Sequence, residues 1–209
     1  PQSKTAATEC AILMGVAQNC IGAQSNKPVM GIVQDSLLGL HRMSASDVIL
    51  DHAHTCRIIG RMRHTPRTLP RPSVTIHSGG GSGKRCFWTG KQLISQLIDD
   101  AIYIEMDHDL PGDPRHPDDW SDELPVVVLQ GTIVSGILRK AHVGTGAGGI
   151  VDTITRELGG VAAMRFMGDA QRITHEFLLQ RGHHVGIDDV MLSSEGHERV
   201  TERLDKATR

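Results

Sequence analysis

Two glycine-rich segments have residue spacings that could serve phosphate chemistry. The first, Gly144-Thr-Gly-Ala-Gly-Gly149, matches the pattern Gly-x-Gly-x-x-Gly. In this pattern the glycines let the backbone approach a pyrophosphate at the start of a helix. A β-rich run precedes the segment and a helical run follows it, as a dinucleotide-binding turn requires. No second strand ending in an acidic residue follows about twenty residues later. A dinucleotide site and a plain tight turn therefore both remain open.

The second segment, Ser78–Arg85, imitates a phosphate-binding P-loop. That motif needs Gly at the position of Ser78 and Ser or Thr at the position of Arg85. Without a hydroxyl at the last position the magnesium ligand is missing. The segment therefore predicts a flexible loop rather than a nucleotide site.

The chain contains 12 histidines, which raises the question of a metal site. His52-x-His54 and His183-His184 are the closest sets, but no His-Glu-x-x-His helix is present. Asp107-His108-Asp109 could bind a divalent cation weakly, or could lie in a solvated loop. These patterns predict no catalytic residues and no metal site.

Charge is distributed unevenly along the chain. Residues 52–98 contain no Asp or Glu but eight basic residues, from Arg57 to Lys91. Residues 107–123 follow with seven acidic residues and one arginine. The basic block could contact phosphates, as in an RNA-binding accessory module that uses Arg57–Arg71. Alternatively, the acidic loop folds over the basic block, or both are ordinary solvated surface.

The elements that must position these residues are mostly helical. Period-3.6 patterns predict helices at 4–17, from Pro28 to about Leu40, from about Ser44 to Ile59, at 90–98, at 149–158, at 161–181 and over the last fifteen or so residues. Strands are expected at 73–77 and 102–106, with a hairpin of 126–129 and 132–138 around Gln130-Gly131. The predicted fold class is α+β, helix-rich with small antiparallel hairpins.

Composition limits the function further. The 209 residues suit one domain and are 39% hydrophobic and 22% charged, which is typical of a globular protein. Aromatic residues make up only 3%, fewer than a protein that binds single strands mainly by base stacking would carry. The net charge of −2 favours neither presence nor absence of a nucleic-acid partner. The four cysteines have the spacing of reduced intracellular thiols, and no stretch is long and apolar enough to span a bilayer.

Several longer blocks resemble a known family. The string Gln24–Gly39 (QSNKPVMGIVQDSLLG) resembles the signature of the largest subunit of RNA polymerase II. Other blocks follow in the order of that family: Pro1–Ser3, Trp88–Gln92, Gly136–Lys140, Gly144–Gly146, Phe177–Gly182 and Gly186–Asp189. The resemblance covers nearly the whole chain, with gaps around 52–86 and 107–125.

The resemblance implies the pore domain (domain 3) at 1–185 and the start of the funnel domain at 186–209. In this family the region helps to form the pore for NTP entry and for backtracked RNA in a DNA-directed RNA polymerase. The family's chemistry is two-metal nucleotidyl transfer. Its Mg²⁺ ligands are aspartates of a loop expected just before Pro1, so the fragment alone is expected to bind no Mg²⁺ and to be inactive.

The resemblance also implies partners and site residues. Implied partners are the other polymerase subunits, especially the second-largest, with DNA template, nascent RNA and NTPs, and no membrane. The implied location is intracellular, in the nucleus if the source is a eukaryotic cell, with a viral source also open. Asn26 and Lys27, at an expected helix start, would attract an anion. Gln34 and the pair Arg139-Lys140 match positions near the pore and the backtracked RNA.

Overall fold

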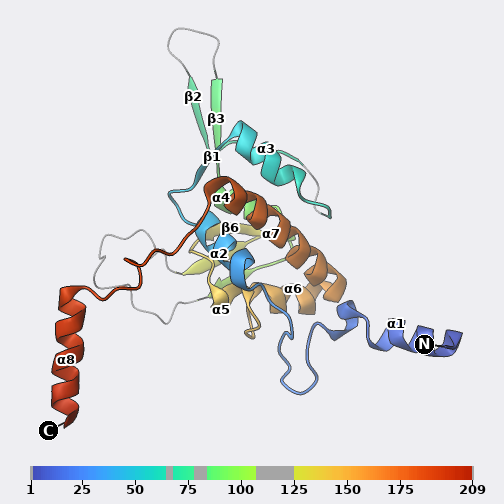
Figure 1. Ribbon diagram of the computed structural model, residues 1–209. Coiled ribbons are helices and arrows are strands. Elements are labelled where there is room, and N and C mark those ends of the chain that lie inside the picture. The colour runs from blue at the N-terminus through green and yellow to red at the C-terminus, as the bar shows by residue number, and fades with distance from the viewer. Residues whose placement is uncertain (1, 65–67, 78–83, 107–124, 209) are drawn as a thin grey trace.

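The computed structural model describes residues 2–64, 68–77, 84–106 and 125–208, and it confirms the predicted α+β class (Figure 1). Its helices are α1 (Lys4–Leu13), η1 (Val16–Asn19, a 3₁₀ helix), α2 (Gln34–Met43), α3 (His52–Gly60), α4 (Gly90–Ser95), α5 (Lys140–Val143), α6 (Ile150–Leu158), α7 (Gly160–Arg181) and α8 (Ser194–Thr208). Its strands are β1 (Ile49–Asp51), β2 (Val74–His77), β3 (Lys84–Thr89), β4 (Ile104–Met106), β5 (Val126–Leu129) and β6 (Thr132–Ser135).

Helix α7 is the central element of the core. It begins after Gly159 and ends at Gly182, whose N–H donates to the Leu178 carbonyl at 2.6 Å. Gly159, which ends the preceding helix α6, and Gly182, which ends α7, both have positive φ. Glycine adopts this conformation without the strain of a Cβ atom. An apolar stripe three and four residues apart is buried along the helix: Ala163, Phe166, Ala170, Ile173 and Phe177. Helices α2, α3 and α6 pack against α7 and complete this core.

Two small antiparallel sheets flank the helices. The first has the strand order β1-β3-β2 and the second the order β4-β5-β6. Gln130 and Gly131 join β5 to β6 with φ of 47° and 70°, the geometry of a tight hairpin turn. The predicted hairpin is therefore confirmed, whereas β3 was not predicted. Residues 78–83, between β2 and β3, lie outside the described residues.

Two predicted helices are wrong in their starts. Pro28 pairs with Ile21 in a β-bridge, and the Ile32 N–H donates to the Val143 carbonyl at 2.9 Å. These contacts hold residues 28–33 extended, so α2 begins at Gln34. Ser44 does not begin the next helix: it is the C-cap of α2, and its hydroxyl accepts the N–H of Leu138 at 2.9 Å.

Helix α3 instead begins at His52, after strand β1. Its cap is Asp51, whose carboxylate accepts the N–H of His54 at 2.8 Å. The capping residue therefore follows the expected chemistry, seven positions later than Ser44.

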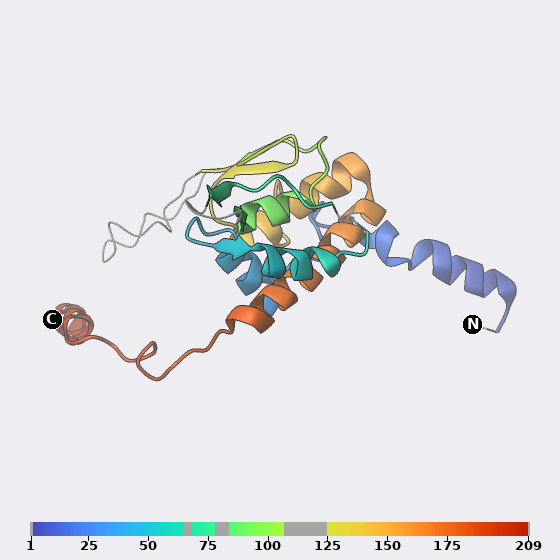
Figure 2. The ribbon, with the colours of Figure 1, turned by 90° about the horizontal axis from the view of Figure 1, so that it is seen from above.

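The two terminal helices project from the core at opposite ends (Figure 2). Neither α1 nor α8 buries a residue. Within the described part of the chain, no helix has the length and apolar character that crossing a membrane would require.

Candidate functional site

Gln34 lies at the mouth of a polar hollow between the start of α2 and α7. The hollow has a volume of about 300 Å³, and its polar side chains include Gln34, Ser36, Gln171 and His175. The Ser36 hydroxyl lies 3.3 Å from Nε2 of His175. Gln34 is exposed and has a positive φ of 52°, an uncommon backbone conformation for a residue with a side chain. We call this site the Gln34 hollow; it offers amide, hydroxyl and imidazole groups to solvent, together with the carboxylate of Asp35.

The pair Arg139-Lys140 lies beside the segment that carries Gln34. Hydrogen bonds fasten the two segments at either end: Leu138 N–H to Ser44 Oγ and Ile32 N–H to the Val143 carbonyl, each 2.9 Å. Gly31 packs so closely on Gly144 that a Cβ atom would lie 2.5 Å from the Gly144 carbonyl carbon.

Within this joined unit the two basic residues differ in exposure. Arg139 is half-buried, and its backbone N–H donates to Nδ1 of the buried His142 at 3.0 Å. Lys140, the first residue of α5, is exposed. The structure thus brings the segments of three predicted site residues together.

Asn26 and Lys27 do not lie at a helix start, so that part of the prediction is wrong. They occupy a tight exposed loop, closed by a hydrogen bond of 2.9 Å from the Gly22 N–H to the Lys27 carbonyl. Asn26 has a φ of 51°, and its carbonyl accepts a hydrogen bond from Arg156 at 2.8 Å. Because α2 begins only at Gln34, the dipole of this helix does not act at Lys27.

The glycine turn Gly144–Gly149 does not have the surroundings of a dinucleotide site. The element before it is helix α5, not a strand. The buried carboxylate of Asp152 already occupies the start of α6, where it accepts the Gly148 N–H at 2.8 Å and binds Arg156 Nε at 2.8 Å. A negative side chain at this helix start opposes a pyrophosphate. The tight-turn interpretation is the one the structure supports.

The basic block is tied to α7 by two buried carboxylates. Asp169, fully buried, accepts the backbone N–H groups of Arg63 and His64 at 2.9 and 2.8 Å. It also pairs with Arg172 at 3.0 Å. Glu176 pairs with Nε of Arg61 at 2.7 Å. The hydrogen bond from Gln180, and then that from Arg61, hold the pKa of Glu176 below its usual range.

Sequence reasoning missed both carboxylates, although a signal was present. Asp169 and Glu176 each stand three residues after a core residue of α7, Phe166 and Ile173. Acidic residues beside an apolar helical stripe indicate buried charges that need cationic partners. The predicted partner of the basic block, the acidic stretch 107–123, lies outside the described residues, as do Asp107-His108-Asp109 and Arg67.

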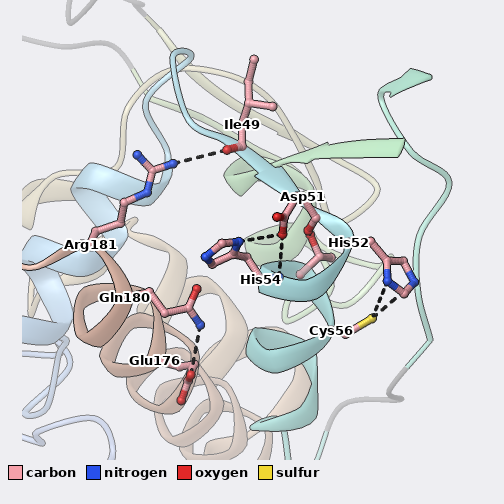
Figure 3. Close-up of polar contacts among 9 residues, drawn as sticks. Ile49, Asp51, His52, His54, Cys56, Glu176, Gln180 and Arg181 are labelled. Atoms are coloured by element: carbon pink, nitrogen blue, oxygen red, sulfur yellow. Dashed lines mark hydrogen bonds and ion pairs between the residues drawn. The ribbon is translucent and has the colours of Figure 1, made fainter. Parts of the chain in front are cut away.

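The His52-x-His54 set gathers around the start of α3 (Figure 3). His54 turns back to Asp51, with Nδ1 2.6 Å from the carboxylate, while the sulfur of Cys56 lies 3.6 Å from Nε2 of His52. The backbone N–H of His54, and then its side chain, lower the pKa of Asp51. Across the described ranges no group of three or more His, Cys, Asp or Glu side chains is arranged to hold a metal ion.

Comparison with known proteins identifies the family. Residues 19–190 match the family model described as RNA polymerase Rpb1, domain 3. The chain belongs to this family. The match runs across α2, both sheets and α7, so it includes Gln34, Arg139 and Lys140 and the resemblance read from the sequence is confirmed.

Two curated relatives extend the similarity to the whole chain. They are the DNA-directed RNA polymerase II subunits RPB1-A and RPB1-B of Trypanosoma brucei brucei, each 30% identical over 209 residues. The alignments cover 100% of this Rpb1 domain 3 chain and 11% of each relative. The boundary between 1–185 and 186–209 stays a prediction.

Proposed function

We propose that this Rpb1 domain 3 chain works as part of the largest subunit of a DNA-directed RNA polymerase, where it forms a wall of the pore. NTPs enter through this pore, and the displaced RNA 3′ end enters it during backtracking. The partners are the other polymerase subunits, above all the second-largest, with template DNA and nascent RNA. The proposed location is the nucleus in a eukaryotic cell, or the site of viral transcription if the source is a virus.

One observation carries the proposal: the family match includes Gln34 and Arg139-Lys140, and their segments are joined. An amide can hydrogen-bond a sugar or base edge, and two cations attract phosphates. The Gln34 hollow adds a hydroxyl, a second amide and an imidazole of the same kind. These groups suit an unpaired RNA strand that needs no aromatic stacking.

The chemistry of Mg²⁺ is assigned to residues outside this chain. Among the described residues no group of three or more His, Cys, Asp or Glu side chains is arranged to hold a metal ion. In the complete enzyme Mg²⁺ would stabilise the attacking and leaving oxygens of nucleotidyl transfer. This chain on its own is proposed to be inactive, and its residues would guide RNA rather than join nucleotides.

Crosslinking in the assembled polymerase tests the proposal. The complete subunit is assembled with its partners on a scaffold whose RNA carries a short unpaired 3′ tail with 4-thiouridine at its end. Crosslinks are expected in the segments that contain Gln34 and Arg139-Lys140. The double variant Arg139→Gln/Lys140→Gln should reduce the crosslink yield, since it removes two charges that attract the tail.

The matched control is Lys84→Gln/Arg85→Gln, which removes an adjacent basic pair on β3, both exposed. This variant should leave the yield unchanged. A tail that crosslinks only to other parts of the subunit would contradict the proposal.

A further inference from the structure

A second hollow adjoins the Gln34 hollow farther along α7. It lies between the end of α3 and α7, has a volume of about 560 Å³, and is lined by Arg61, Arg63, Arg172, His175, Glu176 and Leu179, with Gly60 at its edge. His175 lines both hollows. We call this second site the arginine hollow. Two of its arginines, Arg61 and Arg63, belong to the basic block Arg57–Arg71, whereas the part that α7 contributes was not predicted from the sequence.

Buried carboxylates orient two of the three guanidinium groups from behind. Glu176, with a side chain only 10% exposed, binds Nε of Arg61, whose side chain remains 60% exposed. Asp169, with a side chain 0% exposed, binds one terminal nitrogen of Arg172, whose side chain is 33% exposed. Each carboxylate uses only part of the five N–H donors of its guanidinium, so the remaining donors can bind a ligand in the hollow. Such anchoring lowers the entropy cost of binding a ligand.

The third guanidinium, on Arg63, is exposed, and only its backbone N–H is tied to Asp169. Arg57 lies near enough to lower the pKa of Glu176 and is also exposed. Three arginines thus line the hollow against two carboxylates, and Arg57 adds a further positive charge nearby, so positive charge is in excess. Because both carboxylates are covered, the hollow presents mainly cations to solvent.

The two hollows form one path along α7. Gln171, His175 and Leu179 are exposed and four residues apart, so they line one face of the helix over about 12 Å. Figure 1 shows α2 and α3 beside this helix, and Figure 3 shows Glu176 and Gln180 on α7 beside α3. The Gln34 hollow carries neutral polar groups and one carboxylate, that of Asp35, whereas the arginine hollow is rich in cations.

We propose that single-stranded RNA runs from the Gln34 hollow into the arginine hollow, with its phosphates against Arg61, Arg63 and Arg172. This inference rests on the proposed function and extends it to a second set of residues. Guanidinium forks match phosphate oxygens, and the amides and imidazole on the α2 side match sugars and base edges. An acidic polypeptide would satisfy the arginines, but its carboxylates would gain nothing from the amides beside them and would be repelled by Asp35, whereas RNA can place a sugar or base edge there.

The test compares short and long RNA tails on the assembled polymerase. Scaffolds carry an unpaired RNA 3′ tail of two or of ten nucleotides, and affinity is measured by fluorescence anisotropy over a potassium chloride series. The variant is Arg57→Gln/Arg63→Gln, chosen because neither side chain holds a buried carboxylate. Affinity for the long tail should fall several-fold, and the salt slope should decrease by about 0.7 for each phosphate that the variant no longer neutralises. Affinity for the short tail should not change.

Two controls separate charge from structure. Arg57→Lys/Arg63→Lys keeps both charges and should keep most of the salt slope. Lys84→Gln/Arg85→Gln removes two exposed charges from β3 and should leave both tails unaffected.

The outcomes separate this inference from the proposed function. Unchanged long-tail binding in Arg57→Gln/Arg63→Gln, with the short tail still crosslinking near Gln34, overturns the inference alone. Failure of both tails to crosslink to this chain overturns the proposed function and the inference with it. If Arg57→Gln/Arg63→Gln instead releases an acidic polypeptide from the assembled polymerase and leaves long-tail binding unchanged, the arginine hollow binds that polypeptide and the RNA path is overturned.

Discussion

Helices α7 and α8 are the two longest of the described chain, and they are stabilised in different ways. Over its 22 residues α7 buries eight side chains, among them Asp169 and Glu176, whereas the 15 residues of α8 bury none. Helix α8 contains instead two exposed ion pairs between residues four apart, Glu195–Arg199 and Glu202–Lys206, each with an N–O distance of 2.6 Å. Such pairs contribute only about 0.3–0.5 kcal/mol each.

The difference shows what each helix does for the molecule. Tertiary contacts determine where α7 lies, and its carboxylates in turn position Arg61 and Arg63, just after α3, and Arg172 of α7 itself. Helix α8 is defined by local contacts within its own sequence. The same type of substitution should therefore have different effects in the two helices.

The largest effect is expected for Asp169→Ala. This change leaves the N–H groups of Arg63 and His64 and the guanidinium of Arg172 without their buried acceptor. The free energy of unfolding should fall by about 3–5 kcal/mol, as for other broken buried ion pairs. Urea denaturation of the 209-residue chain measures it. Asp205→Ala in α8 is the control and should change stability by less than about 0.5 kcal/mol; equal effects would mean that Asp169 is not a structural anchor.

A smaller loss is expected for Gly39→Ala, at the contact of α2 with α7. A Cβ atom at Gly39 would lie 2.5 Å from Cβ of Thr174, which is itself buried, so one helix must shift. The strain should outweigh the better helix propensity of alanine and lower the free energy of unfolding by about 1–3 kcal/mol.

Gly196→Ala in α8 provides the matched control for Gly39→Ala. Its nearest neighbours would lie at 3.4 Å, an ordinary contact, so the gain in propensity should dominate and leave the chain equally or slightly more stable. Thermal unfolding followed by circular dichroism distinguishes the two. A stabilised Gly39→Ala variant would show that α2 does not pack closely on α7.

The smallest effect on the free energy of unfolding is expected for Glu176→Gln, and this effect should depend on pH. The folded-state pKa of Glu176 is lowered by Gln180 and Arg61, so its ionised form stabilises the fold above the ordinary pKa of a glutamate, about 4.3. That stability is lost as the pH falls through the lowered pKa. Glu176→Gln should therefore be less stable than the parent at neutral pH, and the gap should narrow in acid.

Stability curves at several pH values measure this gap, with Glu202→Gln in α8 as the control. The exposed Glu202 should show almost no gap at any pH. A gap for Glu176→Gln that stays constant from neutral to acid pH would contradict the assignment of an ionised, hydrogen-bonded carboxylate.

Local patterns predicted the elements whose ends are encoded by special residues. Gln130-Gly131 marked the hairpin, and the helix predicted at 161–181 matches α7, which lies between two glycines of positive φ, Gly159 and Gly182. Turns and caps of this kind depend on a few neighbouring residues, so they can be read without the rest of the chain.

The errors lie where distant segments compete with local preference. Pro28 has the chemistry of a helix start, but pairing with Ile21 and the bond from Ile32 to Val143 keep this stretch extended. Ser44 has the chemistry of a cap, but the N–H of Leu138 uses its hydroxyl. In both places a partner from elsewhere in the chain determines the local conformation.

The sequence by itself determined the fold class, the family and the candidate residues Gln34, Arg139 and Lys140, because these follow from periodicity and from a long ordered string of residues. Only the tertiary structure showed that their segments lie side by side and that Lys27 is not at a helix start. It also showed that the Asp152 carboxylate binds the glycine turn. It alone placed Asp169 and Glu176 behind the arginines. The physical reason is that a buried charge must find its partner in space, and spacing along the chain does not reveal which distant segment supplies it.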